Sequence, residues 1–113
     1  MQKRPNVLIF LPDQHSYFPT LPDHICPMPN VDRLASRGVR CTNSFTPTPI
    51  CTPARTSLVT GLYPHRHLLI QNAHAPLVVA EAPPQGVPTL GEVFRQAGYH
   101  TAYVGKWHVG KTE

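Results

Sequence analysis

The stretch Cys51-Thr52-Pro53-Ala54-Arg55 decides how this chain of 113 residues folds and what it does. Pro53 suits the first position of a helix, because the N–H that proline lacks would have no helical partner there, and Thr52 then stands at the N-cap. The Cys51 side chain is expected to face free backbone N–H groups and the positive end of the helix dipole. Arg55, one turn further on, adds a fixed cation with forked donors that suit oxyanions. The pattern predicts a nucleophile in a corner that attracts anions.

The same five residues resemble the Cys-x-Pro-x-Arg signature of the type I sulfatases. Other parts of the chain resemble that family in the same order, namely residues 4–14 (its opening strand and metal-binding Asp), 29–40 (the next helix and turn), 60–67 (the run after the nucleophile) and 98–108 (its second signature). One short motif is only a hypothesis, whereas ordered matches along nearly the whole chain are not expected by chance.

The resemblance implies a sulfuric ester hydrolase. In this family a dedicated maturation enzyme oxidises the cysteine to formylglycine, an aldehyde that hydrates and attacks the sulfur of a sulfate ester. The modified residue here is expected to be Cys51, with Arg55 and Lys106 stabilising the charge that develops on the sulfate oxygens. His108 is expected to hydrogen-bond the formylglycine or to help the leaving group depart. The implied partners are the formylglycine-generating enzyme and a small-molecule or saccharide sulfate ester.

A divalent metal is the cofactor that the resemblance implies, with calcium as the first choice and magnesium or manganese as alternatives. Asp13 offers a hard oxygen ligand, although an Asp after a strand more commonly caps the following turn. Many sulfatases have two adjacent Asp residues at this place, whereas this chain has Asp13-Gln14, which resembles choline-sulfatase-like and phosphonate-monoester-hydrolase-like relatives. The predicted metal ligands are Asp13, Gln14 and the modified Cys51, and the family's later ligands are not in this sequence.

The predicted substrate-binding residues are Lys106, His108 and Asn72. Lys106 and His108 lie on either side of Trp107 in a segment predicted to be extended, where alternate side chains share a face, so both can point into one site. Asn72 resembles a residue that touches the substrate's charged head in the same relatives. These three residues are expected to bind the sulfate ester.

His65 and His67 form an H-x-H pattern in a loop that offers no carboxylate support. We interpret them as structural residues rather than as metal ligands.

The chain has 3 cysteines and no C-x-x-C pair, which argues against both a disulfide framework and a zinc site. Cys26 and Cys41 lack the setting of Cys51 and are expected to be structural.

The order of elements predicts an α/β fold with a mostly parallel sheet flanked by helices, as in the N-terminal portion of an alkaline-phosphatase-like (sulfatase) fold. The predicted strands are residues 6–11, 39–45 and 101–104. The predicted helices are residues 30–37, a helix that follows Cys51, runs to about Thr60 and is capped by Gly61, and a helix that starts at the capping box of Thr89 and Glu92 and ends before Gly98. Residues 62–88 show no sustained periodicity. Ligands bind beyond the carboxyl ends of strands in such sheets, and the predicted site residues lie there.

The sulfatase fold normally needs several hundred residues. We therefore expect residues 1–113 to be the N-terminal part of a sulfatase catalytic domain, and this piece to be inactive alone.

The formal charge is +4, but the 10 Lys and Arg residues are scattered, which makes nucleic acid a poor partner. The apolar run of residues 7–11 is too short for a signal peptide or a membrane span, so we expect a cytoplasmic chain with no membrane partner.

Two alternatives stay open. A phosphonate monoester or phosphodiester hydrolase of the same superfamily can share the Cys-x-Pro-x-Arg signature. Those relatives often lack the sequence Gly105-Lys106-Trp107-His108, which is intact here, so a sulfate ester is preferred. The second alternative is a truncated chain without catalytic activity.

Overall fold

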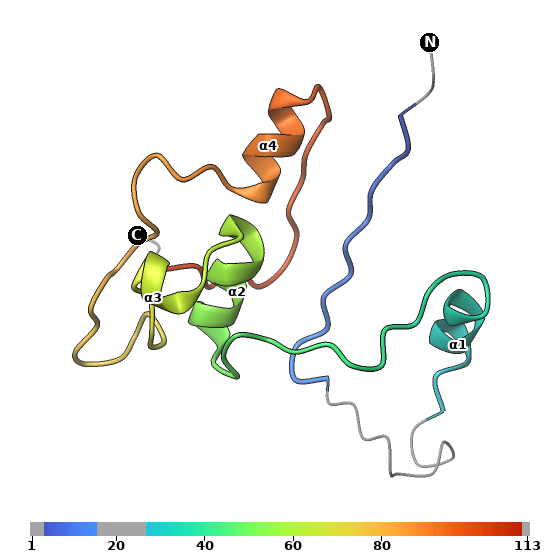
Figure 1. Cartoon of the computed structure of the whole chain (residues 1–113), viewed down its shortest axis with the longest axis horizontal. Coiled ribbons are helices and arrows are strands. Elements are labelled where there is room, and N and C mark those ends of the chain that lie inside the picture. Colours follow the sequence, from blue (N-terminus) through green and yellow to red (C-terminus); the bar gives the residue numbers. More distant parts are fainter. Residues whose placement is uncertain (1–3, 16–26, 112–113) are drawn as a thin grey trace. The chain divides into compact units, whose positions relative to one another are not determined.

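The computed structural model describes residues 4–15 and 27–111. In these ranges the chain forms four helices, α1 (Pro29–Ala35), α2 (Cys51–Thr60), α3 (Pro64–His67) and α4 (Leu90–Gln96). The chain divides into two compact units, Met1–Cys41 and Thr42–Glu113. Helix α1 belongs to the first unit, and α2, α3 and α4 belong to the second (Figure 1).

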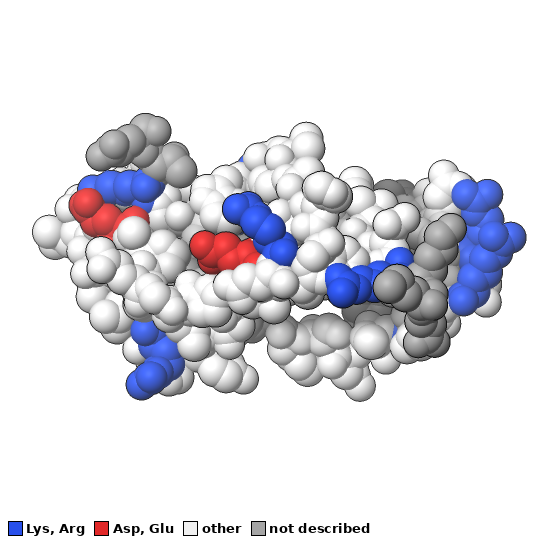
Figure 2. Space-filling view, turned by 90° about the horizontal axis from the view of Figure 1, so that it is seen from above, with Lys and Arg blue, Asp and Glu red and all other residues white. Residues whose placement is uncertain are grey.

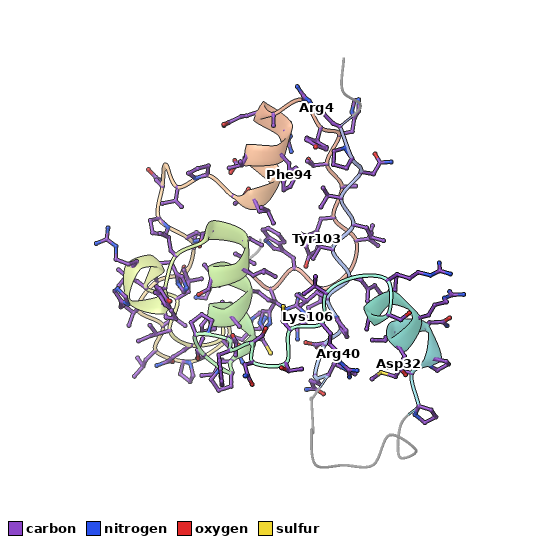
Figure 3. The ribbon with its side chains drawn as sticks, turned by 45° about the vertical axis from the view of Figure 1, so that its right-hand side comes forward. Arg4, Asp32, Arg40, Phe94, Tyr103 and Lys106 are labelled. Atoms are coloured by element: carbon purple, nitrogen blue, oxygen red, sulfur yellow. The ribbon has the colours of Figure 1, made fainter. Side chains whose placement is uncertain are left out.

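Helix α1 confirms the helix predicted for residues 30–37, with slightly different ends. Pro29 lies in its first turn, where proline is tolerated because its missing N–H needs no helical partner. The helix ends at Ala35, and the next turn closes through a hydrogen bond from the Ser36 N–H to the Asp32 carbonyl, 2.9 Å long. Asp32 also pairs with Arg40 of the same unit at 3.9 Å; Figure 3 labels both residues.

Helix α2 confirms the helix predicted between Cys51 and Thr60. Gly61 ends it with a left-handed φ of 70°, as expected for a glycine that follows the last turn. The N-terminus differs from the prediction: the helix begins at Cys51, with Ile50 as the N-cap residue, so Thr52 is not the N-cap. Pro53 is therefore the third helical residue, where a missing N–H still leaves no helical bond unmade.

Helix α3 is a single turn that the sequence did not predict, because one turn is too short to show a period. Helix α2 packs against both α3 and α4. His67 at the end of α3 is fully buried, and Leu69 and Ala73 in the following loop are each only 2% exposed. Together with the polar face of α2 these residues form the core of the second unit.

Helix α4 confirms the capping box. The Thr89 hydroxyl accepts a hydrogen bond from the Glu92 N–H, while the Glu92 carboxylate accepts one from the Thr89 N–H at 2.6 Å. The two hydrogen bonds that the Glu92 carboxylate accepts, from the Thr89 N–H and from the Thr89 hydroxyl, hold the pKa of this exposed carboxyl below its usual value. After the helix, the Tyr99 ring packs edge-on against Phe94 with centroids 5.2 Å apart.

The predicted sheet is not seen in the described residues. Residues 6–11, 39–45 and 101–104 are irregular there, and the structure contains no strand in residues 4–15 or 27–111 (Figure 1). Strands need the N–H and C=O groups of a neighbouring strand, and here the apolar side chains remain uncovered, as shown by Leu8 (91% exposed) and Val104 (95% exposed). The α/β class therefore stays a prediction.

The last described residues fold back onto the loop before α4. The Lys111 N–H donates to the Glu81 carbonyl at 2.7 Å, and the two side chains form an ion pair. Gly110 has φ of 79°, and a Cβ at this position would lie 2.5 Å from the Glu81 carbonyl oxygen, so only glycine fits. This contact anchors the segment that carries Lys106 and His108.

Charged side chains are sparse on the face shown in Figure 2, where Lys and Arg appear in separate groups rather than in one stripe. Among the described residues no helix is long and apolar enough to cross a membrane.

Candidate active site

Cys51 is the first residue of α2 and is partly exposed. Its sulfur lies 3.6 Å from Nζ of Lys106, although 55 residues separate the two in sequence. Gly105, with φ of 102°, turns the chain immediately before Lys106. The structure thus places an ammonium group beside the thiol, at the positive end of a ten-residue helix.

Arg55 lies one turn after Cys51, on the same face of α2. Its side chain is buried, and its Nη1 donates a hydrogen bond of 2.6 Å to the carbonyl oxygen of Lys106 and one of 3.3 Å to the Tyr103 hydroxyl. The Tyr103 hydroxyl in turn donates to the Lys106 carbonyl. Figure 3 labels Tyr103 and Lys106 on the segment that follows α4. Arg55 therefore holds the backbone that carries Lys106, a task that the sequence did not suggest.

Asn72 lies at the N-terminal end of α2. Its Oδ1 accepts a hydrogen bond of 3.1 Å from the Thr52 N–H, and the Ala73 N–H donates to the Thr52 hydroxyl at 3.2 Å. Asn72 thus satisfies one of the helix N–H groups that has no partner within the helix, from a loop far along the sequence. The structure brings Asn72 next to the residue that follows Cys51. Its predicted contact with the substrate stays a prediction.

His108 has surroundings different from those of Lys106. The backbone turns again at His108, with φ of 51°, so the segment is not the extended stretch on which the shared face was predicted. The His108 ring stacks on His74, with centroids 5.6 Å apart and planes 23° from parallel. The backbone at His108 is therefore not extended, and both the shared face of Lys106 and His108 and the catalytic role of His108 stay predictions.

His67 is held by hydrogen bonds at both ring nitrogens. The Leu69 N–H donates to Nδ1 at 3.1 Å, so the proton lies on Nε2, which is 3.0 Å from the Ser57 hydroxyl. Burial of the ring lowers the pKa of His67 below its ordinary value. The structural interpretation of His67 is confirmed. His65 lies on the surface and stacks on Tyr63.

The described residues do not form a complete metal site. Asp13 and Gln14 belong to the first unit, and Gln14 has a φ of 55°. Their oxygens suit a hard cation, but calcium takes about six to eight oxygen ligands. In residues 4–15 and 27–111 there is no group of three His, Cys, Asp or Glu side chains that could hold a metal. Cys41 is exposed and unbonded to another cysteine, and Cys26 lies outside the described residues.

Residues 5–113 match the sulfatase family model. The chain therefore belongs to the sulfatase family.

Three similar proteins indicate the breadth of the match. The chain is 42% identical over 80 residues to the uncharacterized sulfatase YidJ of Escherichia coli K12, covering 71% of this chain and 15% of that protein. It is 38% identical to the choline-sulfatase of Rhizobium meliloti, covering 93% of this chain and 20% of that protein. It is also 38% identical to the steryl-sulfatase of Homo sapiens, covering 73% of this chain and 15% of that protein.

The fold is similar to a solved structure as well. A crystal structure of a protein assigned as a sulfatase, from Bacteroides thetaiotaomicron, matches with a TM-score of 0.64 and 36% sequence identity, covering 71% of this chain and 17% of that chain. The chain thus spans between 15% and 20% of the length of these relatives.

Proposed function

We propose that this chain forms part of a formylglycine-dependent sulfatase in which Cys51 is the residue that is modified. The observation that carries the proposal is the position of Cys51 at the start of α2, with Nζ of Lys106 3.6 Å from its sulfur. A helix N-terminus and an ammonium group both favour a bound anion, which fits the oxygens of a sulfate ester. Membership of the sulfatase family supports the same assignment.

Each residue of the site has a proposed task. The aldehyde of formylglycine supplies, once hydrated, the hydroxyl that attacks sulfur. Lys106 binds a sulfate oxygen and stabilises the negative charge that grows there, and the buried Arg55 holds Lys106 in place while adding its own positive charge. His108 assists the leaving alcohol. Any contact of Asn72 with the substrate would use its Nδ2 group, because Oδ1 accepts from Thr52.

We also propose Asp13 as a ligand of a divalent metal, calcium in the first place, with Gln14 as a neutral neighbour and the modified Cys51 as a third ligand. Further ligands must come from outside the described residues, since calcium needs more oxygens than these supply.

We further propose that residues 1–113 are part of one catalytic domain with an alkaline-phosphatase-like parallel sheet. Location in the cytoplasm and maturation by a formylglycine-generating enzyme stay predictions.

Substrate preference tests the proposed function. The full-length protein, produced together with a maturation enzyme, is expected to hydrolyse an aryl or small alkyl sulfate with a higher kcat/KM than a phosphonate monoester or phosphodiester. Lys106→Ala is expected to lower kcat more than it raises KM, because its charge matters most as negative charge builds up. A higher kcat/KM for the phosphonate or the diester, with Lys106→Ala nearly silent, would favour the alternative assignment.

A further inference from the structure

Tyr103 takes part in the site although no sequence pattern singled it out. Its hydroxyl accepts a hydrogen bond from Arg55 Nη1 at 3.3 Å and donates one to the carbonyl oxygen of Lys106. The same Nη1 donates to that carbonyl at 2.6 Å. The guanidinium, the hydroxyl and the carbonyl therefore form a closed ring of hydrogen bonds around the backbone of Lys106.

The groups in this ring are themselves held in place. The Tyr103 ring packs edge-on against Trp107, with centroids 4.9 Å apart and planes at 84°. Arg55 is only 9% exposed, so its donors have little access to water and losing an acceptor there is costly. The positive φ of Gly105 makes the turn that brings the Lys106 carbonyl back to the Tyr103 hydroxyl.

We propose that Tyr103 is a positioning residue which, together with Arg55, fixes the backbone of Lys106 so that its ammonium group lies against residue 51. A lysine side chain has many rotamers, and anchoring its backbone restricts the volume that Nζ samples. The effect on catalysis rests on the proposed sulfatase function. The position of the charge beside the Cys51 sulfur does not depend on that function, and it can be measured on the unmodified thiol.

The test uses the full-length protein produced without a maturation enzyme, so that Cys51 keeps its thiol. The thiol is alkylated in parallel with iodoacetate and iodoacetamide, and fragmentation mass spectrometry separates the product at Cys51 from that at Cys41. The two reagents react at the same kind of carbon, but iodoacetate is an anion and iodoacetamide is neutral. The ratio of the iodoacetate rate to the iodoacetamide rate therefore reports positive charge near the sulfur. Lys106→Met removes that charge and is expected to lower the ratio about fivefold.

Tyr103→Phe removes only the hydroxyl and keeps the ring against Trp107. Because the Tyr103 side chain lies largely at the surface, at 54% exposed, the fold is expected to survive this change. The ratio at Cys51 is expected to fall at least about twofold, some half of the Lys106→Met effect on a logarithmic scale. Tyr63→Phe, the same change at an exposed tyrosine outside the site, should leave the ratio at Cys51 unchanged. The ratio measured at Cys41 should be the same in every variant.

The outcomes separate this proposal from the proposed function. An unchanged ratio in Tyr103→Phe, with a lowered ratio in Lys106→Met, would overturn the positioning role and leave the sulfatase assignment intact. An unchanged ratio in both variants would show that the ammonium group does not lie beside the sulfur, which overturns the positioning role as well. A protein that responds as expected but never acquires formylglycine would support the role of Tyr103 while defeating the proposed function.

Discussion

Asn72 caps helix α2 from a distance: its Oδ1 accepts a 3.1 Å hydrogen bond from the N–H of Thr52, 20 residues earlier in the sequence. The bond ties the loop after α3 to the first turn of α2. The Ala73 N–H reinforces it by donating to the Thr52 hydroxyl. The residue that follows Cys51 is therefore fixed through both its backbone and its side chain.

Asn72→Ala is expected to lower the free energy of unfolding by about 1 kcal/mol, because a helix N–H loses its acceptor. Asn72→Asp keeps an oxygen acceptor and adds a negative charge at the helix N-terminus, so its stability should match that of the native protein. Urea unfolding of the full-length protein measures both. If Asn72 also touches the sulfate group, Asn72→Asp should raise KM through charge repulsion while stability stays native. Equal loss of stability in both variants would contradict the capping role.

Gly110→Ala is expected to destabilise the protein more than Gly86→Ala. Both glycines have φ near 80°, at 79° and 78°, so an alanine is strained at either by about 1 kcal/mol. Only at Gly110 does the new Cβ also meet a backbone oxygen, that of Glu81, which adds about 1–3 kcal/mol. Thermal or urea unfolding compares the two, and equal losses would show that residues 109–111 do not approach Glu81 closely.

The buried His67 should make stability depend on pH. Burial lowers its folded-state pKa below the value of 6.5 that applies when it is exposed, so below that pH the unfolded state binds a proton that the folded state does not. Stability is therefore complete above about pH 6.5 and falls as the pH is lowered from there toward the folded-state pKa. His67→Gln should flatten this part of the curve of unfolding free energy against pH, whereas the surface variant His65→Gln should not. Identical curves for the native protein and His67→Gln would contradict the burial of a neutral ring.

Asp13→Ala in the full-length protein is expected to lower metal content and hydrolysis rate together, because it removes a hard anionic oxygen. Gln14→Ala, which removes only a neutral oxygen, should cause a smaller loss. Elemental analysis of the purified proteins gives the metal content. Unchanged metal in Asp13→Ala would rule out its role as a ligand.

Features encoded within a few residues were predictable from the sequence. The capping box of Thr89 and Glu92 and the left-handed cap at Gly61 depend on neighbours within one turn, and both were confirmed. The start of α2 was misplaced because threonine is a preferred N-cap residue and isoleucine is not, whereas the helix begins at Cys51 with Ile50 as its N-cap residue. The Thr52 N–H donates a hydrogen bond to Asn72, which lies 20 residues further along the sequence, and no local pattern reveals this contact.

The sequence predicted which residues belong to the candidate site, but not the hydrogen bonds that hold them together. The spacing of Cys51 and Arg55 and the sequence around Lys106 resemble family signatures, so these residues were identified in advance. The bonds from Arg55 and Tyr103 to a backbone carbonyl were not, since a carbonyl carries no signal in the sequence. The apolar run of residues 6–11 predicts a buried strand, but a strand forms only with a partner, and the described residues do not supply one.

The most direct test of the central claim is mass spectrometry of the peptide that contains Cys51, from active full-length protein produced together with a maturation enzyme. We expect loss of the thiol at residue 51 and an aldehyde that reacts with a hydrazide, while Cys41 keeps its thiol. Cys51→Ala should give no hydrazide product and no turnover, and Cys41→Ala should retain both. An active preparation in which Cys51 is still an unmodified cysteine would show that residue 51 is not the formylglycine nucleophile.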